Sequence, residues 1–183
     1  MRATTEDPAQ AGHDLLDEVI KAATAAGDRL RAEFSPATRP AGRGAMAELG
    51  HHIEDLVLGE LRPTLAGLRP AAGWAGDDLE TRPLPAGEWW VVDAVEGGVN
   101  YVHGLPEWAV TVTLMRDGEP VLTVVRQPEG DRTYTAIRGR GAHLNGQRLR
   151  VSAKTSLDAA AVVTGQAEAG QARPAPRGGH RPG

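Results

Sequence analysis

One stretch of the chain constrains the fold more than any other: an apolar segment that carries two carboxylates into a glycine-rich turn. Residues 89–92 are aromatic or β-branched, which favours a short β-strand. Asp93 and Glu96 follow directly, and Gly97 and Gly98 then predict a turn whose backbone can approach a ligand closely. Because carboxylates at a strand end suit metal binding or proton transfer, we expect the functional site here.

Two amphipathic patterns precede this strand. Apolar side chains recur at intervals of three and four over residues 15–34, with a helix start expected near His13 and an interruption at Gly27. Residues 46–65 repeat the pattern, with apolar residues on one face and acidic residues and histidines off it. The sequence therefore predicts two helices before the strand.

Beyond residue 104 the apolar residues alternate instead, which predicts strands joined by tight turns. Asp117-Gly118 is a strong hairpin signal. The expected strands are residues 108–115, 121–126, 133–138 and 148–151, with a looped hairpin at 139–146 and the start of a further strand in 157–164. Helices followed by hairpins predict a layered α+β domain with a mostly antiparallel sheet.

Composition excludes several classes of function. The chain of 183 residues has no cysteine, which rules out disulfides, thiolate metal sites and cysteine nucleophiles and makes a cytoplasmic location the default. Its net charge is −4 and its arginines are scattered, so no nucleic-acid partner is expected. No apolar run approaches the roughly 20 residues of a membrane span, so no membrane partner is expected either.

The run DAVEGGVNYVHG, residues 93–104, resembles the signature of the inositol monophosphatase family, usually Asp-Pro-(Ile/Leu)-Asp-Gly-Thr-Thr-Asn-(Phe/Tyr)-x-His. Ala94, Glu96 and Gly98 replace the proline, the second aspartate and a threonine of that signature. The family's Gly-x-Gly-Ala-x-x-Asn-Gly is present at residues 139–146. The resemblance implies the N-terminal half of the family's fold, with two helices packed on the sheet.

Two further positions of the family's site follow from this resemblance. A Gly-Asp-Asp run containing Asp77 is similar to the family's Gly-Glu-Glu motif, so Asp77 would face a metal ion. The family's acidic residue on the second helix falls at Gly50, with Glu48, His51 and His52 as the nearest substitutes. A solvated helix surface is the simpler interpretation of the two histidines, because they lack the i, i+4 spacing of metal ligands.

The resemblance covers residues 13–165. Residues 1–12 are expected to be a flexible lead-in and residues 166–183, rich in Gly, Ala, Pro and Arg, a disordered tail. No Trp-Asp pair occurs, although the family's second half supplies one. Without that half, apolar sheet surface is exposed, and we expect a homo-oligomer to cover it.

The candidate site residues fall into three groups. The expected catalytic residues are Asp93, Glu96, Asp77 and His103. The expected substrate-binding residues are Gly97, Gly98, Asn100 and Tyr101. If a metal is retained, its expected ligands are Asp77, Asp93, the Val95 carbonyl and Glu96.

Three functions remain open. Three converging carboxylates repel one another unless a cation or a shared proton compensates. Because the replacements at Glu96 and Gly98 disturb the strict geometry of Mg²⁺, we expect a shared proton, no cofactor, and a repurposed acid–base enzyme. Such an enzyme would isomerise, dehydrate or cyclise a small metabolite, for example in a biosynthetic pathway. The alternatives are a Mg²⁺-dependent phosphomonoesterase acting on inositol phosphate or a related small phosphate ester, and a non-catalytic binding or scaffold protein.

Overall fold

The structure of the protein is a computed structural model that describes residues 8–75 and 83–161. One compact unit ends at Arg150, and the chain from Val151 onward belongs to a separate unit. Asp77 and the expected tail 166–183 lie outside the described residues.

Two long helices come first in the chain. Helix α1 spans Pro8–Glu33 and begins earlier than the expected start near His13. Helix α2 spans Arg43–Leu68 and turns its buried face, built by residues spaced three or four apart, toward the sheet. Gly27 does not break α1, and it allows close packing, because a Cβ there would lie 2.8 Å from Pro128 Cγ.

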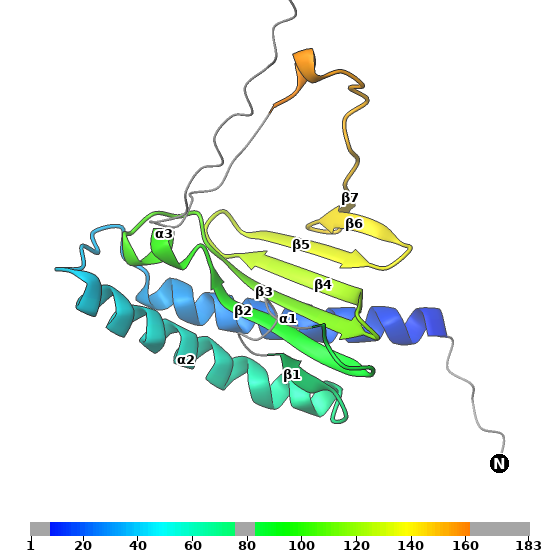
Figure 1. The fold of residues 1–183 in the computed structure, drawn as a ribbon, viewed down its shortest axis with the longest axis horizontal. Helices are drawn as coiled ribbons and strands as arrows, with labels where there is room; N and C mark the ends of the chain where they lie inside the picture. Colours follow the sequence, from blue (N-terminus) through cyan, green and yellow to red (C-terminus); the bar gives the residue numbers. More distant parts are fainter. Residues whose placement is uncertain (1–7, 76–82, 162–183) are drawn as a thin grey trace, which may run out of the picture. The chain divides into compact units, whose positions relative to one another are not determined.

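Among the described residues, seven strands form one sheet in the order of the sequence, β1 to β7 (Figure 1). The strands are β1 (Gly73–Ala75), β2 (Glu88–Glu96), β3 (Ala109–Arg116), β4 (Glu119–Gln127), β5 (Arg132–Ile137), β6 (Gly141–Leu144) and β7 (Gln147–Arg148). All neighbours are antiparallel except β1, which pairs with β2 in parallel. The expected α+β layered fold with a mostly antiparallel sheet is confirmed.

The two faces of the sheet differ in burial. Trp90, Val112, Leu114 and Val124 are completely buried beneath the helices, with α1 against β3 and β4 and α2 against β2. The alternate residues form cross-strand rows such as Val91–Thr113–Thr123–Ala136, and these side chains are only half-buried. Since Asp93 alternates with Val91, it lies on this less covered face.

Four details differ from the expected elements. A short helix, α3 (Gly98–Val102), follows β2 where a turn was expected. Strand β6 lies inside the expected loop 139–146, and the strand expected at 148–151 is reduced to β7. Residues Leu157–Ala159 form a 3-10 helix, so the expected strand is wrong for the described part of 157–164. Within residues 8–75 and 83–161, no helix has the length and apolar character needed to cross a membrane.

Candidate functional site

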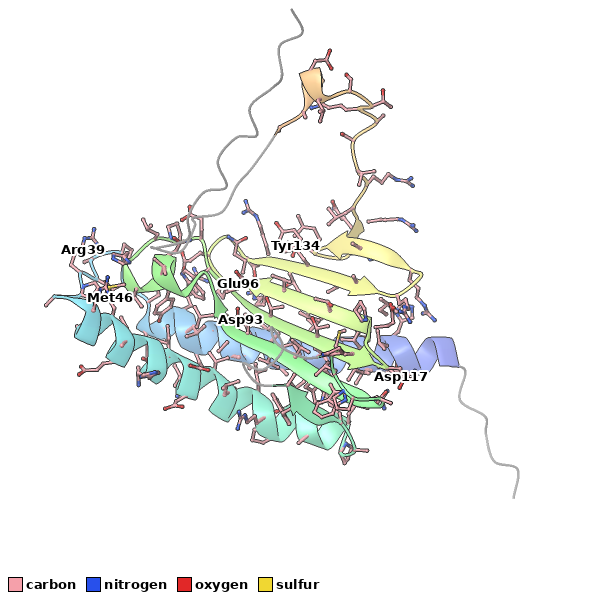
Figure 2. All side chains as sticks on the ribbon, in the orientation of Figure 1. Arg39, Met46, Asp93, Glu96, Asp117 and Tyr134 are labelled. Carbon is pink, nitrogen blue, oxygen red and sulfur yellow. The ribbon has the colours of Figure 1, made fainter. Side chains whose placement is uncertain are left out.

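A β-bulge at the end of β2 brings Asp93 and Glu96 together (Figure 2). In a regular strand, residues three apart point to opposite faces of the sheet. The pairing with β3 shifts between them, since Asp93 lies opposite Thr111 whereas Glu96 lies opposite Ala109. The extra residue on β2 re-aims the strand end, and the two carboxyl groups interact, because Asp93 raises the pKa of Glu96.

The electrostatics of this pair follow from that contact. Asp93 Oδ1 accepts a hydrogen bond from the Val95 backbone N–H at 2.9 Å, which fixes the carboxylate at the bulge. The pKa of Glu96 is raised above its ordinary value, first by the hydrogen bond to Asp93, then by partial burial and by the charge of Asp93. Two carboxylates that interact this closely repel each other when both are charged, so such a pair shares a proton or attracts a cation.

Asp93 lines a cavity of about 1100 Å³ between α2 and the first two strands. Positions three or four apart on α2 form one wall, β1 and β2 form the other, and α3 borders one end. The lining includes Arg43, Gly50, His51, Glu54, Leu58 and Arg62 from α2, Trp74, Val91 and Asp93 from the strands, and Gly98 and Val99 from α3. The cavity therefore lies between α2 and Asp93, whereas Glu96 is not among its lining residues.

Cationic side chains on α2 favour an anionic ligand in this cavity. The Arg62 guanidinium lies 5.3 Å from the centre of the Trp74 ring, a cation–π contact that orients its planar donors. Among the described residues, Arg43 and Arg62 take part in no ion pair, whereas Arg116 and Arg126 are engaged by carboxylates. Arg43, Arg62 and His51 are thus available to a phosphate or carboxylate group.

Two of the departures from the family signature face the same cavity. A Cβ added at Gly50 or at Gly98 would meet nothing within 4 Å. No packing in the described structure therefore requires glycine at either position. The space for a larger side chain is present where the resemblance expects an acid and a threonine.

Tyr101 is placed as a structural residue. It is 3 % exposed, and its hydroxyl donates a hydrogen bond of 2.8 Å to the Leu30 carbonyl in α1. Its ring packs with Phe34 and Trp108, with centroid distances of 5.4 and 5.0 Å. The enclosed ring and hydroxyl favour a structural role, and the expectation that Tyr101 binds substrate stays a prediction.

The remaining residues of the motif hold the turn between β2 and α3 in place. Gly97 has φ 81°, and a Cβ there would lie 2.6 Å from the Glu107 carbonyl oxygen, so the close backbone approach requires glycine. Asn100 Nδ2 donates to the same carbonyl at 2.8 Å. His103 is exposed, with Nδ1 2.8 Å from the Val99 carbonyl oxygen. These three do not line the cavity, and their predicted functional roles stay predictions.

The oxygen donors suit one hard cation. Asp93 and Glu96 are carboxylates whose mutual repulsion a divalent ion would relieve, and Mg²⁺ prefers oxygen ligands. Within the described ranges no group of three or more acidic, histidine or cysteine side chains is close enough to hold a metal. Asp77, the expected third carboxylate, lies outside those ranges, so the described residues fit one ion with incomplete protein ligation.

Sequence reasoning missed the α2 wall of the cavity. Arg43, Glu54 and Arg62 of α2 line the cavity, as does Trp74 of β1, and none of them was a candidate residue. A signal was present, because the cavity-facing positions 43, 47, 50, 54, 58 and 62 recur at helical spacing beside the apolar face. This spacing shows that the six positions share one side of the helix, but it does not show which element that side contacts.

The described residues form a layered α+β domain with a carboxylate pair at a bulged strand end, beside a cavity that Arg43 and Arg62 line. The chain belongs to the inositol monophosphatase family, whose sequence model matches residues 13–177. The resemblance of the motif at residues 93–104 is therefore confirmed.

Named relatives and solved structures agree with this assignment. Inositol-1-monophosphatase of Rhizobium meliloti is 40% identical over 112 residues, covering 61% of this chain and 42% of the relative. Nus factor SuhB of Pseudomonas aeruginosa is 32% identical over 159 residues, covering 82% of this chain and 57% of the relative. The crystal structure of the suppressor protein suhB from Bartonella henselae matches with TM-score 0.59 and 28% identity, covering 77% of this chain and 55% of that one. The chain thus spans about half the length of the curated relatives it matches.

Proposed function

We propose that this chain provides the metal- and phosphate-binding part of a phosphomonoesterase that acts on inositol phosphate or a related small phosphate ester. The observation that carries the proposal is the interacting pair Asp93 and Glu96, of which Asp93 lines a cavity that also presents Arg43 and Arg62. Membership of the family, and the name of the Rhizobium meliloti relative, support this reaction class over the others.

Each residue of the site has a part in this proposal. Asp93, Glu96 and the Val95 carbonyl would hold Mg²⁺, which when bound supplies positive charge that polarises the phosphoryl group. The Val95 N–H donates to Asp93 Oδ1 and restrains the carboxylate, which leaves Oδ2 to bind the ion in this proposal. Arg43 attracts the anionic ester, and His51, which lines the same cavity, would take a proton from the attacking water.

Phosphate release tests the proposal directly. The chain is incubated with inositol 1-phosphate and with an aryl phosphate, with Mg²⁺ and with a chelator. We expect Mg²⁺-dependent release that the chelator stops and that Asp93→Asn abolishes with little change in melting temperature. Asp55→Asn, an equal charge change at an exposed position of α2 outside the cavity, should keep the activity. No release from either ester under any condition would refute the proposal.

A metal-independent acid–base enzyme is the second candidate, and the raised pKa of Glu96 is the observation that favours it. A carboxyl that keeps its proton to higher pH can donate it to a leaving group. This function predicts turnover of a small metabolite without cofactor, insensitive to a chelator, and no rise of the melting temperature in millimolar Mg²⁺. A Mg²⁺-dependent rise that Asp93→Asn removes would instead favour the phosphatase.

The remaining expectations stay predictions. A binding or scaffold protein would be stabilised by a ligand without any turnover. A homo-oligomer would cover the half-buried rows of the sheet, such as Val91–Thr113–Thr123–Ala136, and light scattering showing a stable monomer would count against it. The expected cytoplasmic location and the expected lack of a nucleic-acid partner need their own experiments.

A further inference from the structure

The less covered face of the sheet, on the side away from α1 and α2, is apolar in its middle. Its cross-strand rows consist mostly of half-buried aliphatic, aromatic and threonine side chains: Val91–Thr113–Thr123–Ala136 and Asp93–Thr111–Val125–Tyr134–Leu144. Thr113 Oγ1 lies 3.0 Å from Thr123 Oγ1, so these two hydroxyls have a hydrogen-bond partner that they keep when water is removed. An apolar surface of this kind favours contact with another protein layer.

Opposite charges lie at the two sides of this face. Asp93 and Glu96 are on β2, whereas Arg132 is on β5, two residues before Tyr134 and therefore on the same face of the sheet. The register through β3 and β4 puts Glu96 and Arg132 at the same level along the strands. Figure 2 shows Asp93, Glu96 and Tyr134 toward one end of the sheet and Asp117 toward the other. The two carboxylates and Arg132 are exposed.

Glu96 and Arg132 are too far apart to pair within one chain. Three strand intervals separate β2 from β5, which is about 14 Å at roughly 4.8 Å per interval. Within the residues that the structure describes, Arg132 takes part in no ion pair, and no third acidic, histidine or cysteine side chain joins Asp93 and Glu96. Each side of the face therefore carries charge that a second molecule can neutralise.

A two-fold axis parallel to the strands, midway between β3 and β4, brings these opposite charges together. It places β2 of one copy over β5 of the other and keeps the level along the strands. Sheets packed face to face lie about 10 Å apart, a distance that a glutamate and an arginine side chain span together. The pair of Glu96 with Arg132 of the partner copy then occurs twice, with the apolar rows between. This self-complementary charge favours a second copy over an unrelated protein.

We propose that the less covered face is a homodimer interface, in which two copies pack sheet on sheet and Arg132 of each copy pairs with Glu96 of the other. The interface reaches the candidate site, because Glu96 interacts with Asp93, which lines the cavity. Arg132 of the partner copy thereby supplies a cation to a carboxylate pair that lacks one within its own chain. The inference does not depend on phosphate hydrolysis.

Sedimentation equilibrium of the full chain tests the interface, in a buffer with a chelator so that no divalent ion occupies the carboxylate pair. We expect a dimer at micromolar concentration. Arg132→Glu and Glu96→Arg each oppose like charges across the interface, so either alone should raise the dimer dissociation constant at least about tenfold. A mixture of the two variants should return this constant to about the wild-type value, because the mixed dimer holds one original and one reversed ion pair.

The matched control is Arg29→Glu, the same charge reversal at an exposed position of α1, which packs on the other face of the sheet. It should leave the dissociation constant unchanged. Arg132→Gln removes the charge without reversing it and should weaken the dimer less than Arg132→Glu, and circular dichroism shows whether each variant is folded.

Three results would overturn the interface: a monomeric wild type, a dimer that ignores Arg132→Glu, or a mixture no tighter than its components. The proposed function is tested separately. A charge-dependent dimer without phosphate release would uphold the interface and refute the phosphatase, whereas Mg²⁺-dependent release by a monomer would uphold the phosphatase and refute the interface.

Discussion

Replacing Tyr101 by phenylalanine separates a structural role from substrate binding. The substitution removes the hydroxyl that donates to the Leu30 carbonyl at 2.8 Å and keeps the ring against Phe34 and Trp108. The Leu30 carbonyl also accepts a hydrogen bond from the Phe34 backbone N–H at 3.0 Å, so it is not left unsatisfied. The expected loss is therefore the net worth of one hydrogen bond, about 1 kcal/mol.

Thermal unfolding followed by circular dichroism measures this loss. For a chain of this size, about 1 kcal/mol lowers the melting temperature by about 2–4 °C. If Tyr101 is structural, KM for a phosphate ester stays at the wild-type value. An unchanged melting temperature together with a raised KM would show that the hydroxyl contacts substrate, which would refute the structural assignment.

The same variant changes the response to alkaline pH. Burial, and next the negative charge of Glu33, raise the pKa of Tyr101 from its ordinary 10.0 to about 12. The unfolded chain therefore ionises this phenol at lower pH than the folded protein does. Its contribution to stability is complete below about pH 10 and is lost as the pH rises toward 12. In Tyr101→Phe this part of the alkaline loss should be missing, and an identical decline in both proteins would contradict the burial argument.

Two further predictions concern glycines. Gly27→Ala places a Cβ 2.8 Å from a Pro128 side-chain atom, so denaturant unfolding should show a free energy of unfolding lower by about 1–3 kcal/mol. The control is Gly59→Ala on α2, whose Cβ meets nothing within 4 Å and which should raise that free energy by up to about 1 kcal/mol. A Gly27→Ala variant more stable than the wild type would contradict the close packing of α1. Gly50→Asp combined with Gly98→Thr fills open space with the side-chain types that the family motif has there, so phosphate release should rise at least about tenfold with little change in melting temperature. Unchanged activity in a folded double variant would show that these positions do not limit the reaction.

Local patterns in the sequence determined most of the elements. Helix periodicity predicted α1 and α2, and alternation with tight-turn residues predicted β2, β3, β4 and β5, because each pattern depends only on which side of an element is buried. The carboxylates Asp93 and Glu96 were recognised for the same reason, since they directly follow an apolar strand. The motif around them was sufficient to place the chain in its family.

Only the tertiary structure decided how these pieces meet. Spacing alone would place Asp93 and Glu96 on opposite faces of β2, and the bulge that unites them depends on pairing with β3. Tyr101 belongs to the same motif, yet its hydroxyl reaches back to Leu30 in α1, a contact across the chain that no local pattern encodes. The cavity wall of α2 exists because β1 pairs in parallel with β2 and brings Trp74 under Arg62. Periodicity specifies which face of an element is buried, whereas the partner of that face depends on contacts between residues far apart in the chain.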